Sequence, residues 1–428
     1  MMVKDDIKLP NSGRVVIVDD TYDEVKPIMD FMGKNNSPYL YYDGKRETLP
    51  DKPMSGIRFV FLDIELAGFE GQSEKSKASA LTSCLRSLIS NENGPYAIIF
   101  WTKHSEIIDL VIENCEKVGI PPIIHVNLEK QDCKNEKHEF DFNIISKKIS
   151  EKLATIGAFQ LYTEWENIVN NSCTHFINKF SGFTPLDEKW QSTTLNIFYE
   201  LFHAAAGRNK PTEKRKQFEL AYSVLNRSFS DTLERKTTKK ISIPDDLKFS
   251  RGSLDKSIIA KINSSLLISK IPLQESGLGN VNLIENSNDY LAVLQAAMLK
   301  KKYDSMKKCK LCRIIITPSC DIAQNKLLKH NDVPVHRVVY GILCPADAIY
   351  NKEDKGKDAF FQVGPIWIED EAKVILSHFG TITFEVDMKP NIPACFALKR
   401  DLVFDLQSKA ANHVNRLGNL QLEFKAES

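Results

Sequence analysis

The chain has 428 residues and a nearly balanced charge, with 57 Lys and Arg against 56 Asp and Glu and a net charge of +1. This length predicts two or three domains, and the balanced charge provides no global field that would favour nucleic acid or an anionic membrane. No apolar stretch approaches the ~20 residues of a membrane span, and the N-terminus lacks an apolar signal core. We therefore expect a cytoplasmic protein without a membrane partner. Nine cysteines, an odd number without a secretory signal, predict reduced thiols.

Five short apolar runs in the first third of the chain predict buried strands, at residues 14–18, 38–43, 59–62, 97–101 and 122–128. Segments of helical periodicity separate them, as in the stripe formed by Val25, Ile28, Met29 and Met32. This alternation predicts an α/β fold, a flavodoxin-like doubly wound parallel sheet of five strands over residues 12–150. In such a sheet the ligand pocket lies beyond the carboxyl ends of the strands.

Polar side chains follow four of these runs where the strands are expected to end. They are Asp19 and Asp20, Asp63, Thr102 and Lys130. Because the carboxyl ends of parallel strands meet at one edge of a sheet, we expect these side chains to share a pocket.

Each residue type suits one part of phosphoryl transfer to a carboxylate. Asp63 is the predicted nucleophile, and the Thr102 hydroxyl and Lys130 are predicted to hold the phosphoryl oxygens. Mg²⁺ prefers hard oxygen ligands. The predicted magnesium ligands are Asp19, Asp20, Asp63 and the main-chain carbonyl of Glu65.

Over residues 12–150 this set resembles the receiver domain of two-component response regulators. The resemblance implies a phosphoprotein that depends on magnesium and has a sensor histidine kinase as its partner. Lys103 departs from the pattern, because receivers usually carry a small residue after the switch hydroxyl, and Leu128 stands where a switch aromatic often lies. A degenerate receiver, whose acids only terminate strands, is the alternative.

The remaining chain predicts a helical middle domain at 151–305 and a β-rich α+β domain at 306–428. Near-helical apolar spacing from Asn143 to Phe180 predicts a long helix, which leaves a homodimer open, although packing on neighbouring helices is preferred. Further helices are predicted at residues 190–206, 214–233, 254–269, 290–303 and 407–416. Strands are predicted at residues 312–317, 338–343, 360–363, 373–376 and 381–386.

Two features of the C-terminal third have side chains suited to chemistry. Cys309 and Cys312, with Cys320 and one of His330, His336 or Cys344, offer the ligands of a tetrahedral zinc site, and Cys320 alone offers a nucleophile. Buried structural thiols are the preferred interpretation of these cysteines. The lysine-rich stretch at 300–302 offers contacts to phosphates, but it lacks interleaved aromatics, and solvated helix faces explain it better than nucleic acid does.

As a whole, the chain resembles the receiver-containing proteins of bacterial anti-phage phosphorelays, in particular the DtcB family of phosphate buffers in Detocs systems. The resemblance implies a role in antiviral defence, in which the chain competes for phosphoryl groups with a second receiver-bearing effector. Its expected chemistry is limited to self-phosphorylation and autodephosphorylation at Asp63. Two alternatives remain: a response regulator whose C-terminal domain is an output module that binds nucleic acid or acts through Cys320, and a pseudo-receiver scaffold.

Overall fold

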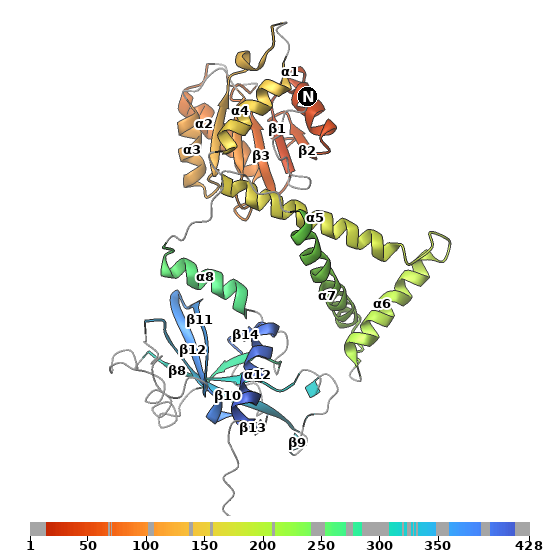
Figure 1. The fold of residues 1–428 in the computed structure, drawn as a ribbon. Helices are drawn as coiled ribbons and strands as arrows, with labels where there is room; N and C mark the ends of the chain where they lie inside the picture. The colour runs from red at the N-terminus through yellow and green to blue at the C-terminus, as the bar shows by residue number, and fades with distance from the viewer. Residues whose placement is uncertain are drawn as a thin grey trace, which may run out of the picture. The chain divides into compact units, whose positions relative to one another are not determined.

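The computed structural model describes residues 14–415 except 67–68, 70, 102–106, 137–139, 155–156, 208–209, 241–252, 271–276, 285–307, 319–320, 323–326, 328, 331–332, 348–358 and 387–393 (Figure 1). It divides into two compact units, Met1–Phe198 with Tyr222–Phe249, and Tyr199–Ala221 with Ser250–Ser428. The division at 12–150, 151–305 and 306–428 stays a prediction. Among the described helices, none has the length and apolar character needed to cross a bilayer.

A parallel five-stranded sheet forms the centre of the first unit. Its strands are β1 (Arg14–Val18), β2 (Tyr39–Tyr42), β3 (Ile57–Leu62), β4 (Ala97–Trp101) and β5 (Ile124–Leu128). The strands lie in the order β2-β1-β3-β4-β5, and every neighbouring pair is parallel. This is the flavodoxin-like doubly wound order, so the predicted fold class is confirmed.

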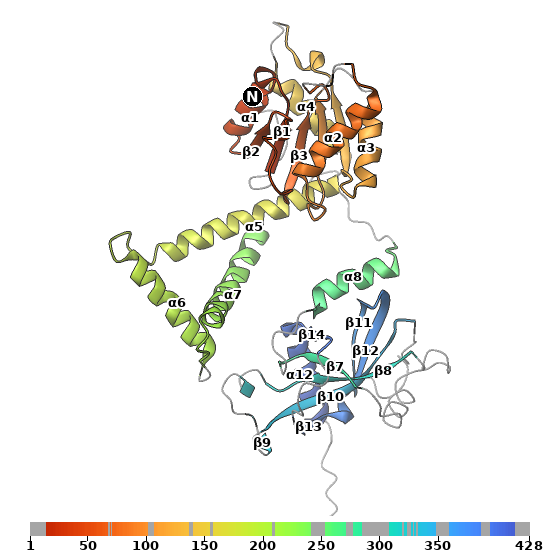
Figure 2. The same cartoon turned by 180° about the vertical axis from the view of Figure 1, so that it is seen from behind.

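Helices cover both faces of this sheet (Figure 2). They are α1 (Tyr22–Lys34), α2 (Glu74–Leu88), α3 (Ile108–Lys117) and α4 (Phe142–Ala154), with a 3-10 turn η1 at Gln131–Cys133. One core packs α2 and α3 against the sheet, and a second packs α1 and α4 against the opposite face. The alternation of side chains along each strand supplies both cores, because successive residues point to opposite faces.

Long helices follow the sheet: α5 (Gly157–Ser181), α6 (Trp190–Ala206) and α7 (Lys214–Lys240). The single helix predicted from Asn143 to Phe180 is two elements, because α4 ends at Ala154 and α5 begins at Gly157. Phe159 on α5 packs edge-on against Phe59 of β3, with ring centroids 5.7 Å apart. The start of α5 therefore belongs to the core of the sheet.

The second unit is built on a nine-stranded sheet in which the described strand pairs are antiparallel. Its strands are β6 (Ile268–Ser269), β7 (Asn280–Leu283), β8 (Lys310–Ile315), β9 (Lys329–His330), β10 (Val333–Pro345), β11 (Phe360–Ile368), β12 (Glu371–His378), β13 (Thr383–Val386) and β14 (Phe396–Leu398). The helices α8 (Lys256–Leu267) and α12 (Arg400–Asn415) and the 3-10 turn η3 (Phe379–Thr381) complete it. The predicted β-rich C-terminal region is confirmed.

Two details of this unit correct the sequence-based expectations. The strands β6 and β7 come from the segment predicted to be all helical, and they pair with β14 in the C-terminal sheet. The closing helix α12 begins at Arg400, earlier than the predicted Gln407. The helix predicted at 290–303 lies outside the described residues.

Candidate functional site

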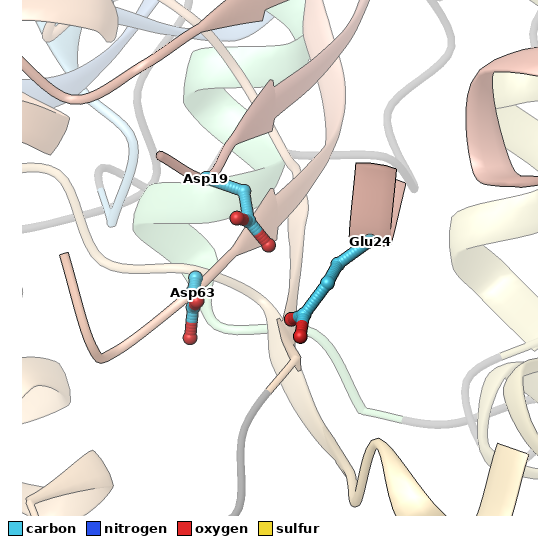
Figure 3. A group of neighbouring side chains, drawn as sticks. All are labelled: Asp19, Glu24 and Asp63. Atoms are coloured by element: carbon cyan, nitrogen blue, oxygen red, sulfur yellow. The ribbon is translucent and has the colours of Figure 1, made fainter. Parts of the chain in front are cut away.

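Three carboxylates converge at the carboxyl edge of the parallel sheet (Figure 3). Asp19 follows β1 and Asp63 follows β3, and these neighbouring strands end in register, with Val18 opposite Leu62. Glu24 comes from the first turn of α1. One oxygen from each of the three acids lies within 4.8 Å of the others. The strand pairing thus brings together acids that are 44 residues apart in the chain.

Lys130 extends into this cluster from the residues after β5. Its Nζ lies 2.9 Å from Asp63 Oδ2 and 3.4 Å from Asp19 Oδ2, and it makes its closest contact with Glu24 Oε2. Since β4 lies between β3 and β5, the long lysine stem is what allows this contact. One ammonium therefore faces three carboxylates.

Backbone groups orient the two buried acids. The Thr21 N–H donates to Asp19 Oδ1 at 2.7 Å, and the Glu65 N–H donates to Asp63 Oδ1 at 3.2 Å. The Asp63 N–H donates to the Val18 carbonyl at 2.9 Å, which extends the pairing of β1 and β3 to the acid itself. Such fixed turns hold each carboxylate in one direction before any ligand arrives.

Burial and charge shift the acid–base properties of the cluster. Burial, with the charge of Asp63, raises the pKa of Asp19 to about 7, although Lys130 and the Thr21 N–H act in the opposite direction. Burial also raises the pKa of Asp63, and Lys130 opposes this shift. For Lys130, burial lowers the pKa, but Asp63, Glu24 and Asp19 together raise it above its usual value. The ammonium is thus retained as the charged form.

The predicted site residues have different outcomes. Asp19, Asp63 and Lys130 are brought together, with only 1%, 4% and 8% of their surfaces exposed. Asp20 is partly buried and lies outside the three-acid cluster, with Oδ1 3.5 Å from the Thr21 hydroxyl, so its role as a metal ligand stays a prediction. Thr102 and Lys103 lie outside the described residues.

Glu24 was not predicted from the sequence. Its only signal is its position next to Val25, at the start of the buried stripe of α1, in the turn that follows the end of β1. Because that stripe faces the sheet, the first turn of the helix lies at the rim of the pocket. Glu24 can be assigned to the pocket only when the start of α1 relative to the end of β1 is known.

The zinc alternative is wrong for the Cys309 and Cys312 pair. Cys312 lies in β8 and Cys309 directly precedes this strand. Because the two residues are three positions apart, their side chains point to opposite faces of the sheet. Cys309 packs with Cys344 in a small core, whereas Cys312 belongs to the larger core on the other face. Burial raises the pKa of Cys312 to about 12, which suits a structural thiol. Cys320 lies outside the described residues.

Comparison with known proteins gives little beyond the fold. No protein-family model matches the sequence, and no curated protein matches it. A two-component response regulator from Clostridium difficile is 13% identical, with 34% of this chain and 98% of that chain covered and a TM-score of 0.20. A yeast Spc42 trimeric coiled-coil fusion is 17% identical, with 35% and 84% covered and a TM-score of 0.20.

TM-scores this low do not demonstrate a shared fold, so the fold is assigned from the order and direction of the strands. The parallel order β2-β1-β3-β4-β5 fits a receiver domain.

Proposed function

We propose that this chain is a receiver-type phosphoacceptor, which takes a phosphoryl group from a sensor histidine kinase onto Asp63. The observation that supports this most is the contact of 2.9 Å between Lys130 Nζ and Asp63 Oδ2, in a pocket assembled from the ends of β1, β3 and β5. A buried carboxylate beside a fixed ammonium is equipped as a nucleophile with a donor for the incoming phosphoryl oxygens.

The chemistry requires few groups. An Asp63 carboxylate oxygen attacks the phosphorus of a phosphohistidine, so a P–O bond forms while the P–N bond breaks, and the leaving imidazole takes a proton from water. Lys130 donates to the phosphoryl oxygens, and Thr102, which follows β4 between the other two strands, is the second proposed donor. In such transfers, most of the rate enhancement comes from positioning the reactants and from stabilising charge.

The donor set fits Mg²⁺, because the carboxylates of Asp19 and Asp63 are hard oxygen ligands that already converge. Asp20 and the main-chain carbonyl of Glu65 complete the proposed ligands. When bound, Mg²⁺ supplies positive charge to the phosphoryl oxygens and offsets the repulsion among the acids.

The proposed biological role is that of a phosphate sink in an anti-phage phosphorelay. It is supported by the resemblance to the DtcB family and places the chain in the cytoplasm, in competition with a second receiver-bearing effector for one kinase. Hydrolysis of the acyl phosphate at Asp63 would then return the sink to its starting state.

The test combines the kinase, the effector's receiver and this chain in one tube with radiolabelled ATP. Wild type should carry label and reduce label on the effector, whereas Asp63→Asn should carry none and leave the effector more strongly labelled. Asp51→Asn, which removes an exposed carboxylate, is the matched control. Equal effector labelling with wild type and Asp63→Asn would exclude the sink.

Two other outcomes identify the alternatives. A wild-type chain that takes no label from the kinase or from acetyl phosphate with Mg²⁺ would leave the pseudo-receiver scaffold. A cellular response that Asp63→Asn silences, rather than releases, would indicate a response regulator with an output module.

A further inference from the structure

We propose that Glu24 is a positioning residue for Lys130. The Glu24 carboxylate holds the Lys130 ammonium before phosphorylation, and it competes with the phosphoryl group for that ammonium afterwards. This inference rests on the proposed function and adds a residue that the sequence did not single out. Lys130 has three N–H donors, and its three carboxylate contacts, with Asp63, Asp19 and Glu24, use all of them.

When Asp63 is phosphorylated, its contact with Lys130 passes to the acyl phosphate, and Lys130 can turn a second donor to the phosphoryl oxygens only if it gives up Asp19 or Glu24. Asp19 has 1% of its side chain exposed, so water cannot replace the ammonium at its carboxylate, which needs either Lys130 or a bound Mg²⁺ as its counter-charge. The Glu24 side chain is 40% exposed, so water can replace the ammonium at its carboxylate. Glu24 is thus the partner that Lys130 can leave most easily.

Glu24 also has no freedom to move far away while α1 stays in place. The helix is fixed by the buried side chains of Val25, Ile28, Met29 and Met32. Its first turn remains at the rim of the pocket, so the Glu24 carboxylate stays within reach of Lys130 after transfer. The result is a continuing competition between a carboxylate and a phosphoryl group for one ammonium, which shortens the life of the acyl phosphate.

Two substitutions separate contact from charge. Glu24→Gln keeps the length of the side chain but removes the charge, and Glu24→Asp keeps the charge but is one methylene shorter. Both weaken the hold on Lys130, so both should lengthen the half-life of the phosphorylated chain about three- to tenfold, as expected when one charge-assisted hydrogen bond no longer competes. Asp23→Asn removes an exposed charge from the neighbouring position and should leave the half-life unchanged.

The first measurement follows the loss of label from the full chain after loading with labelled acetyl phosphate and Mg²⁺. A longer half-life in both Glu24 variants, with Asp23→Asn like wild type, supports the proposal. A longer half-life in Glu24→Gln alone would mean that the charge acts at a distance, and would overturn the role through contact. An unchanged half-life in both would also overturn it.

The second measurement does not need phosphorylation. A pulse of acetic anhydride labels lysines, and mass spectrometry gives the rate at Lys130 relative to the exposed Lys34. Both Glu24 variants should label Lys130 several times faster than wild type and Asp23→Asn. No change at Lys130 would overturn the proposal even if Asp63 is phosphorylated. Faster labelling in a chain that accepts no phosphoryl group would confirm the hold on Lys130 but overturn the competition, along with the proposed function.

Discussion

Arg58 and Glu166 join β3 of the parallel sheet to α5 by a two-point ion pair. Arg58 Nε lies 2.8 Å from Glu166 Oε2, and Nη2 lies 3.1 Å from Oε1. Its remaining nitrogen, Nη1, donates to the main-chain carbonyls of Ile57, Asn93 and Pro95. The side chains are only 14% and 23% exposed, so this pair is shielded from solvent and fixes α5 to the amino-terminal edge of the sheet.

Glu166→Gln should loosen α5. The substitution leaves Arg58 partly buried without its counter-charge, which we expect to cost about 1–3 kcal/mol of stability in the first unit. Hydrogen exchange across α5 measures the effect directly, and amides near Glu166 should lose protection. Glu200→Gln, at an exposed position on α6, serves as the control. Equal protection in both variants would show that the ion pair does not hold the helix.

The raised pKa of Asp19 predicts a pH-dependent stability. Its folded value is about 7 against an ordinary 3.8, so the folded state binds more protons between these values. Protonation of Asp19 therefore stabilises the folded state fully below about pH 4, and this stabilisation is lost as the pH rises through about 7.

Asp19→Asn should accordingly raise the melting temperature of the first unit at pH 8, with a smaller gain at pH 5. We expect about 2 kcal/mol at pH 8, less than the full shift implies, because the variant also gives up the contact with Lys130. Thermal unfolding at both pH values, with Asp51→Asn as the exposed control, provides the measurement. A melting temperature that falls at pH 8 would contradict the sign.

Substitution of Gly341 is expected to destabilise the second unit strongly. Gly341 lies in β10 between Cys312 of β8 and Ser377 of β12, and a Cβ there would lie 2.5 Å from the Leu376 carbonyl oxygen. Gly341→Ala should therefore destabilise this sheet by about 2–4 kcal/mol.

The contrasting variant is Gly33→Ala in α1, where a Cβ meets nothing within 4 Å. It should stabilise the first unit by up to about 1 kcal/mol, because alanine favours helix. Calorimetry of the full chain compares the two. A neutral Gly341→Ala would show that β10 and β12 can separate at little cost.

Cysteine accessibility tests the assignment of structural thiols. Among the described cysteines, Cys173 and Cys395 are exposed, and the buried ones are Cys84, Cys115, Cys133, Cys309, Cys312 and Cys344. A maleimide should label the two exposed thiols quickly and the buried ones only on unfolding. A chelator selective for zinc should leave the melting temperature unchanged. One zinc per chain that is lost in Cys309→Ser would overturn this.

The parallel sheet could be predicted from the sequence because each strand is a short apolar run that is followed by a polar residue. The sequence was also sufficient to place Asp19, Asp63 and Lys130 together, since parallel strands end at a common edge. Thr102 stays a prediction.

Contacts away from the shared carboxyl edge of the strands could not be predicted. Glu24 depends on how α1 is rotated against the sheet, and the Arg58–Glu166 pair joins residues 108 positions apart whose charges look solvated in the sequence. The short strand β6, with only two residues, has no periodicity to detect. Each of these is set by packing rather than by local pattern.

The strand β3 carries Arg58 near its start and Asp63 just beyond its end, about 16 Å apart at the usual rise of a strand. The same strand thus anchors α5 at one edge of the sheet and presents the acid at the other. Under the proposed function, a phosphoryl donor would approach one end of β3, whereas α5 is anchored at the other end. The anchor of α5 therefore does not occupy the edge of the sheet where the acids converge.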